Sequence, residues 1–263
     1  VLHALNLAKQ INAKGVVLHT GSHKGKGFES VVDQIVDALE EILDRSDSST
    51  ILALEDMAGQ GGTIGTTFEE LETLLQHVNS SRLKVCLDTC HAFAAGYDIR
   101  NKKSVSSVIQ QFDSTIGLEN LAVVHANDSK VDLGEQKDRH ENIGQGYIGT
   151  LGFEEMVHHP GFAQKAFILE VPGYPDADTG KSNGNSGGVW QNGGRHPSGF
   201  NENINIVGWT NTELTYMSEI NITHWHPITY DFDTATYSTD QEYEDSVPDN
   251  FSVIFCIFFS KST

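Results

Sequence analysis

Short runs of β-branched and other apolar residues alternate with longer amphipathic stretches over the first two thirds of the chain. In the longer stretches apolar residues recur every three or four positions, as at Val31, Ile35, Leu39 and Ile42, which is the spacing of one helix face. This alternation is typical of consecutive βα units whose strands form a parallel sheet. The predicted strands are residues 15–19, 51–55, 84–88, 121–125 and 166–170.

Every one of these predicted strands ends in a side chain that can bind a metal ion. A buried strand seldom ends in a charged or polar side chain without a functional reason, yet each of these strands does. In a (β/α) barrel of the TIM type the carboxyl ends of the strands converge on one mouth, where active sites lie. We therefore expect these side chains to line one cavity. They are His19, Glu55, Asp88, His125 and Glu170.

Two further clusters enlarge the predicted site. His91 follows Asp88 by three residues, and Asp138 and His140 lie two positions apart, on one face of an extended segment. The combined set has four imidazoles and four carboxylates. Four carboxylates in one cavity repel one another unless cations lie among them.

Imidazole and carboxylate donors suit zinc, and also manganese or iron. Eight donors exceed the needs of one tetrahedral ion and fit two or three. Clustered metal ions polarise a phosphoryl oxygen and stabilise the leaving oxygen, so the pattern indicates phosphoester hydrolysis.

Three longer motifs carry a resemblance to a known family. They are residues 54–61 (LEDMAGQG), residues 85–98 (VCLDTCHAFAAGYD), and residues 125–130 (HANDSK) followed by residues 138–146 (DRHENIGQG). These segments resemble the signature motifs of the endonuclease IV family of abasic-site (AP) endonucleases. The similarity extends over residues 1–174. It implies a (β/α)8 barrel with a trinuclear zinc site that cuts DNA 5′ to an abasic site during base excision repair and also removes blocked 3′ ends.

The same resemblance implies a role for each donor. His19 and Glu55 would bind the first zinc ion, for which the family uses one further histidine that this chain lacks. Glu55 would bridge to the second ion and act as the catalytic residue. The second ion would be held by Glu55, Asp88, His125 and Glu170, and the third by His91, Asp138 and His140.

DNA contacts are expected beside the mouth of the barrel. Gln60 and Gly61 lie in a glycine-rich loop that would bring backbone amides to DNA phosphates. Lys130 and Arg139 would add positive charge to the rim. The chain as a whole has a net charge of −19, which argues against loose electrostatic binding of nucleic acid, so binding must depend on a local site.

The resemblance also predicts a domain organisation. Residues 1–175 match the last five of the family's eight βα units, so we expect an N-terminally truncated barrel with two unpaired sheet edges. Residues 176–203 form a Gly/Asn/Ser-rich linker, and residues 204–263 form an unassigned tail unrelated to the family. Within that tail, residues 251–259 are aromatic, nearly uncharged and free of proline, which makes them an aggregation hazard if they are exposed.

The remaining features bear on location. Three cysteines are too few for a disulfide framework, and the N-terminus lacks a signal-peptide pattern, so we expect an intracellular protein of the cytoplasm or, in a eukaryote, of the nucleus or mitochondrion. No apolar run is long enough to span a bilayer, so no membrane partner is expected.

Two other functions remain open from the sequence. A sugar isomerase of the same barrel superfamily also gathers carboxylates and histidines at strand ends. A catalytically inactive fragment that serves only in binding is the third possibility. The segment from Asp138 to His140 and the loop around Gln60 and Gly61 favour the endonuclease.

Overall fold

The computed structural model describes residues 1–10, 13–163 and 165–172, together with the backbone of short strands in the remainder of the chain. The first part contains α1 (Leu2–Gln10), β1 (Gly15–His19), α2 (Val32–Arg45), β2 (Ile51–Glu55), α3 (Phe68–Val78), β3 (Leu83–Asp88), α4 (Thr89–Ala95), α5 (Lys102–Thr115), β4 (Leu121–His125), β5 (Asp128–Ser129), β6 (His140–Glu141), α6 (Gly149–His158) and β7 (Ala166–Ile168). Short 3-10 helices lie at Phe28–Ser30, Gln60–Gly62, Leu118–Asn120 and Pro160–Phe162. The tail contributes β8 (Asn205–Thr210), β9 (Glu213–Met217), β10 (Ile228–Asp231), β11 (Thr236–Thr239) and β12 (Phe255–Phe258).

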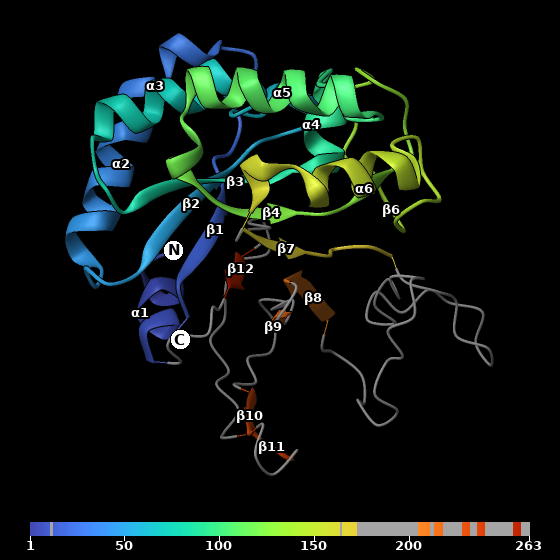
Figure 1. The fold of residues 1–263 in the computed structure, drawn as a ribbon. Coiled ribbons are helices and arrows are strands. Elements are labelled where there is room, and N and C mark those ends of the chain that lie inside the picture. Colours follow the sequence, from blue (N-terminus) through green and yellow to red (C-terminus); the bar gives the residue numbers. More distant parts are fainter. Residues whose placement is uncertain are drawn as a thin grey trace.

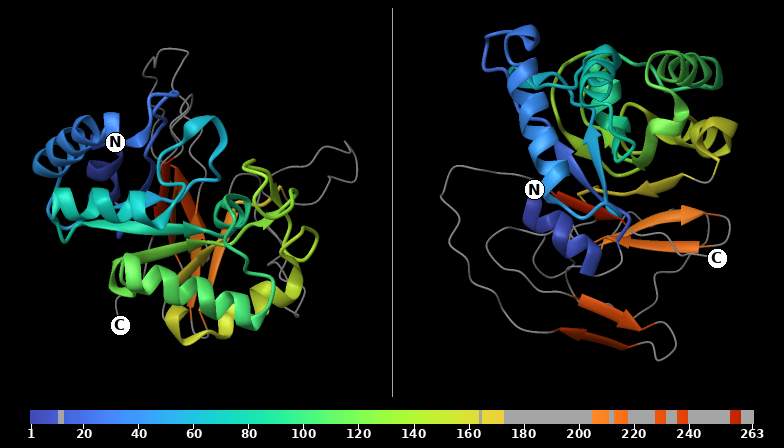
Figure 2. Two further views of the ribbon diagram at one scale, coloured as in Figure 1. Left: turned by 90° about the horizontal axis from the view of Figure 1, so that it is seen from above. Right: turned by 90° about the vertical axis from the view of Figure 1, so that its left-hand side faces the viewer.

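The parallel strands form one sheet in the order β1-β2-β3-β4-β7. Helices α2, α3, α5 and α6 cover one face of this sheet, and β8 and β9 of the tail lie beyond its other face (Figures 1 and 2). The strands are in register at their carboxyl ends, where His19 pairs with Glu55 and Asp88 pairs with His125. The TIM-barrel type of sheet predicted from the alternating pattern is confirmed.

The two faces of the sheet carry different side chains. Leu54, Val85 and Val124 belong to the large hydrophobic core beneath the helices. The next residues along the strands point to the opposite face, because successive side chains of a strand alternate. There a second, smaller cluster of buried side chains forms an apolar layer that consists of Val17, Ala53, Cys86, Val123 and Ile168.

Local signals fix the ends of the predicted helices. Thr67 caps α3 by accepting a hydrogen bond from the amide of Glu70, and Asn79 ends it in a left-handed conformation. Asn101 and Ser104 form a reciprocal capping box at the start of α5. Because both helices also bury apolar stripes, their sequence pattern and their packing agree.

The structure corrects several expectations. The third strand begins at Leu83 rather than Lys84, and the fifth ends at Ile168 rather than Glu170. The outer edge of β1 was expected to be unpaired, and this is wrong: β12 pairs with it antiparallel, with Gly15 opposite Phe258 and Leu18 opposite Phe255. The apolar segment flagged as an aggregation hazard thus satisfies backbone hydrogen bonds at a sheet edge.

Other expectations concern residues that are only partly described. The predicted linker, residues 176–203, lies outside the described residues, so the domain boundaries stay predictions. Among the helices that the structure describes, none has the length and apolar character needed to cross a membrane.

Candidate metal centre

The sheet brings all eight predicted donors to one end of the strands. Two groups of donors have ligand atoms that all lie within 4.8 Å of one another. We call the group formed by Glu55, Asp88, His125 and Glu170 site A, and the group formed by His91, Asp138 and His140 site B. Seven of the eight predicted donors thus lie in these two groups, and His19 lies 3.0 Å from Glu55 of site A.

Site A is built around one imidazole nitrogen. His125 Nδ1 lies 3.0 Å from Glu55 Oε1, 3.0 Å from Glu170 Oε2 and 3.8 Å from Asp88 Oδ2. Glu170 reaches this position from the segment just after β7, two residues beyond the last paired residue. Three carboxylates therefore surround one ring nitrogen in a buried place, which is an arrangement suited to a divalent cation.

Site B has the hydrogen bonding typical of metal-binding histidines. The Nδ1 atoms of His91 and His140 lie 2.9 Å from the backbone oxygens of Asp56 and Glu170. Because a carbonyl can only accept, each Nδ1 carries a proton, so Nε2 is the nitrogen that can bind a metal ion once the ring is neutral. Both Nε2 atoms are 3.3 Å from Asp138 Oδ1, and neither has a hydrogen-bond partner within the described part of the chain. Such orientation by a backbone oxygen is characteristic of metal ligands.

Glu55 connects the donors of site A to the remaining histidines. Its Oε2 lies 3.0 Å from His19 Nε2, while its Oε1 lies 3.4 Å from His91 Nδ1 in addition to the contact with His125. The two oxygens of one buried carboxylate thus face different imidazoles. His19 joins none of the candidate ligand groups among the described residues, so the bridging of two cations by Glu55 stays a prediction.

Asp88 and Asn127 hold the donors in position. Asp88 Oδ1 caps α4 by accepting from the amide of His91 at 2.9 Å, so one carboxylate is both a helix cap and a candidate ligand. Asn127 Nδ2 donates to Asp88 Oδ2 at 2.5 Å, and Asn127 Oδ1 accepts from the amide of Glu170 at 2.7 Å. Asn127 is not among the residues predicted from the sequence. Its position two residues after the donor His125 was the only signal available.

The charges of the cavity shift the pKa values of its groups. Burial opposes ionisation of Glu55, yet the imidazoles of His125 and His19 outweigh it and hold the pKa of this carboxyl well below its usual value. Burial likewise opposes protonation of His91 and His125. The carboxylates around His91 nevertheless raise its pKa well above the usual value, and Cys86, followed by Glu170 and Glu55, does the same for His125. Despite its burial, Asp138 beside His91 and His140 has its pKa lowered to about 2. Without metal, imidazolium ions balance the carboxylates.

These shifts predict a pH dependence for the metal-free chain. Raised folded-state pKa values at His19, His91 and His125 stabilise the fold below the unfolded-state value of about 6.5 and lose that effect as pH rises through the folded values. The melting temperature in a chelator should therefore fall across the neutral and mildly alkaline range. Stabilisation by added zinc should grow over the same range, because imidazoles must lose their protons to bind metal. Melting curves at a series of pH values test both trends. A melting temperature that rises with pH in the presence of the chelator would contradict the balance between imidazolium ions and carboxylates.

The residues predicted to contact DNA lie around this cavity. Gln60 Oε1 accepts from the amide of Asp138 at 3.2 Å, so the glycine-rich loop touches a ligand of site B. Gly61 has a left-handed φ of 63° and its oxygen accepts from Ser22 Oγ. Arg139 donates to the backbone oxygen of Asp138 at 2.6 Å, and Lys130 Nζ lies 3.9 Å from Glu141 Oε2. Gln60 and Arg139 thus contact Asp138 of site B directly, and the contact of all four residues with DNA stays a prediction.

A second residue that the sequence analysis missed is Asp128, which organises the loop after site B. Its buried carboxylate accepts from the amides of Ser129 and Ile148 through Oδ1 and of Gly144 and Gly146 through Oδ2, at 2.8–3.0 Å. A Cβ atom at Gly146 would lie 2.5 Å from Asp128 Oδ1, so only glycine allows this close approach. The loop follows His140 directly, and Asp128 therefore fixes its path.

Replacing Asp128 by asparagine should destabilise the chain by roughly 2–5 kcal/mol, because an NH2 group would face amide donors and leave about two of them unsatisfied at ~1–3 kcal/mol each. Urea denaturation measures the loss. Asp37→Asn, on the exposed face of α2, is the matched control and should change the free energy of unfolding by less than about 0.5 kcal/mol. Equal free energies of unfolding for the two variants would show that the hydrogen bonds from backbone amides to Asp128 do not stabilise the chain.

Comparison with known proteins relates this chain to a family of TIM barrels. The model of the family described as xylose isomerase-like TIM barrel matches residues 1–191. A protein from Oceanobacillus iheyensis named probable endonuclease 4 is 46% identical over 169 residues, which are 64% of this chain and 56% of that protein. The protein of the same name from Staphylococcus aureus strain JH9 is 47% identical over 163 residues, which are 62% and 54% of the two chains.

A solved structure gives the same result. The crystal structure of endonuclease IV from Thermus thermophilus superposes with a TM-score of 0.57 at 35% identity, and the match covers 65% of this chain and 60% of that one. The chain spans about half the length of the curated relatives it matches.

Proposed function

The chain belongs to the xylose isomerase-like TIM barrel family and, within it, to the endonuclease IV family, and from this premise we propose that its metal centre hydrolyses the phosphodiester bond 5′ to an abasic site in DNA. Removal of blocked 3′ ends is part of the same proposal, since it breaks the same type of bond. Zinc is the metal of this proposal, because groups of three and four imidazole and carboxylate donors suit it and the family resemblance implies it.

One observation carries the proposal: the donor groups of site A and site B lie side by side, with Asp88 of site A close to His140 of site B. Asp88 Oδ2 is 3.8 Å from His125 Nδ1 of site A and 3.7 Å from His140 Nε2 of site B. Cations held in both groups would therefore be close neighbours. Metal ions in such a cluster polarise a phosphoryl oxygen, lower the pKa of water and neutralise charge on the leaving oxygen.

The side chains of the chain itself have three tasks in this reaction. Glu55 stays ionised and presents an oxygen to each side of the cavity, so it can orient an attacking water. Asn127 and Asp88 keep the donors in place. The loop at Gln60 and Gly61 would meet the DNA backbone, with Lys130 and Arg139 supplying local positive charge that the acidic chain otherwise lacks.

The test compares two DNA duplexes that differ only in one abasic site. The purified chain should cut the abasic duplex once, on the 5′ side, and leave a 3′-hydroxyl end that a polymerase can extend. A chelator should stop the reaction and added zinc should restore it. Equal cutting of both duplexes, or cutting that survives the chelator, would contradict the proposal. A folded, zinc-loaded chain without any cutting would favour the binding-only alternative.

A further inference from the structure

A thiol lies in the apolar layer directly beneath the metal donors. The layer residues Val17, Ala53, Cys86, Val123 and Ile168 each precede a donor by two positions, so layer and donors face the same side of the sheet. Four of the five carry only hydrocarbon. Within this layer only Cys86 has a side-chain atom that can bind a metal ion.

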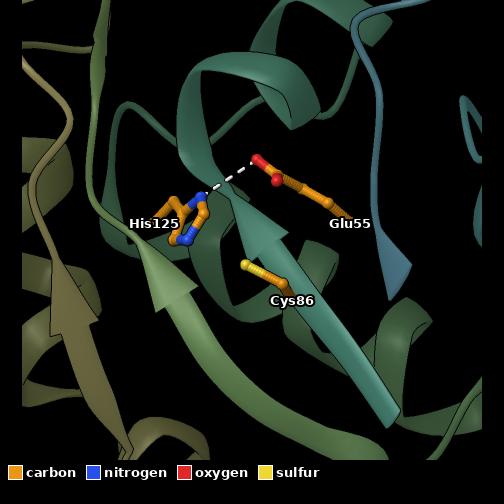
Figure 3. Close-up of side chains that lie close together, drawn as sticks. All are labelled: Glu55, Cys86 and His125. Carbon is orange, nitrogen blue, oxygen red and sulfur yellow. Dashed lines mark hydrogen bonds and ion pairs between the residues drawn. The ribbon is translucent and has the colours of Figure 1, made fainter. Parts of the chain in front are cut away.

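The sulfur of Cys86 is directed at site A rather than into the helix-covered core. In β3, Cys86 stands opposite Glu55 of the neighbouring strand. Ligand atoms of Glu55, Cys86 and His125 all lie within 4.8 Å of one another, and all three residues are buried. Figure 3 shows the thiol below the carboxylate of Glu55 and beside the ring of His125.

His125 provides a second, independent observation. Its Nδ1 faces Glu55 at 3.0 Å, as the dashed line in Figure 3 marks. Its other ring nitrogen lies on the side of Cys86 in the same view. That Nε2 atom is fully buried and makes no well-aligned hydrogen bond among the residues that the structure describes, and the side chain that interacts with the ring on this side is Cys86. A buried ring nitrogen beside a thiol is a pair of borderline and soft ligands without an assigned use.

We propose that Glu55, Cys86 and His125 form a second, deeper metal site that binds a thiophilic divalent cation such as Cd²⁺. Thiolate and imidazole ligands favour such an ion. The three carboxylates and one imidazole of site A favour a harder cation. A cation at the deeper site would need an oxygen of Glu55 and would lie a few ångström from the cation of site A, so the two ions compete for Glu55 and repel one another. Cadmium at the deeper site therefore displaces the zinc ion of site A.

The exchange balances without any redox partner. The S–H bond of Cys86 breaks, a bond between sulfur and cadmium forms, and the proton passes to solvent while zinc leaves as Zn²⁺. A simpler interpretation of Cys86 is a small apolar filler of the layer. The filler role predicts that serine or alanine in its place changes packing only and leaves cadmium binding as it is.

Cys90 serves as an internal control. Its sulfur lies with Asp88 and His140 in another group of candidate ligands, but its thiol already donates to the backbone oxygen of Arg139 at 3.5 Å. Cys256 controls for the third thiol of the chain. Single Cys→Ser variants at these positions therefore separate the deeper site from the other two thiols.

The test titrates the zinc-loaded chain with Cd²⁺ while recording the ultraviolet charge-transfer absorption of a sulfur-cadmium bond and the zinc released to a chromogenic chelator. We expect the band to appear, with about one Zn²⁺ released for each Cd²⁺ bound, in the parent, Cys90→Ser and Cys256→Ser chains. Cys86→Ser and Cys86→Ala should both lose the band. Two substitutions are used in case one of them prevents folding. Circular dichroism and the zinc content of each variant establish which variants are folded.

Three outcomes would overturn the deeper site: no band in the parent chain at saturating Cd²⁺, a band that persists in folded Cys86 variants, or a band lost in Cys90→Ser. DNA cutting is not needed for any of these readouts. If the cadmium site fails while zinc-dependent incision is intact, the proposed function still stands. If cadmium binds through Cys86 but the chain does not cut DNA, the deeper site stands and the proposed function fails.

Discussion

Glu55→Ala should lower the rate of incision at an abasic site by ~10³-fold or more, the scale of losing a group that acts directly in the transition state. Glu55 is the donor that faces both His19 and His125, at 3.0 Å each. Its removal takes one of the four donors from site A and leaves an attacking water without an acceptor. Incision of a labelled abasic duplex under single-turnover conditions measures the effect.

Two companion variants make the result specific. Glu55→Gln keeps the shape of the side chain and removes its charge, so it should lose nearly as much activity as Glu55→Ala. Glu154→Ala, at an exposed position of α6, should keep the parent rate. If Glu55→Ala cut abasic DNA as fast as the parent chain, the bridging role would be wrong.

Zinc should raise the melting temperature of the metal-free chain by ~10–20 °C. Each site filled at a hundredfold excess over its dissociation constant contributes about 2.7 kcal/mol, and about 1 kcal/mol corresponds to ~2–4 °C in a chain of this size. Sites A and B together therefore supply ~5 kcal/mol. Thermal melts with zinc and with a chelator give the shift directly.

The shift should divide between the two sites. His140→Ala removes a ligand of site B and leaves the four donors of site A intact, so about half of the zinc-induced shift should remain. The exposed His158→Ala is the control and should keep the full shift. A melting temperature that does not respond to zinc in the parent chain would show that the donors do not bind it.

The donors could be predicted from the sequence because each one sits at a fixed place in a repeated pattern. A short apolar run followed by His, Glu or Asp identifies a strand and its carboxyl end together. Parallel strands place such ends side by side, as His19 and Glu55 or Asp88 and His125 show. Local periodicity was therefore sufficient for the sheet, the helices and most of the centre.

The supporting residues could not be predicted in the same way. Asn127 and Asp128 act through hydrogen bonds to groups far away in the sequence, such as Glu170 and Gly144. Their residue types are also common in turns, so the sequence offers no local sign of these roles. The pairing of β12 with β1 joins the two ends of the chain, and no pattern within either segment specifies its partner.

Diffraction from crystals of the zinc-loaded chain, recorded on both sides of the zinc absorption edge, tests the central claim most directly. The structure predicts anomalous peaks at two neighbouring positions, one among Glu55, Asp88, His125 and Glu170 and one among His91, Asp138 and His140. Well-ordered crystals grown with saturating zinc that show no anomalous peak at either position would contradict the assignment of a multinuclear metal centre.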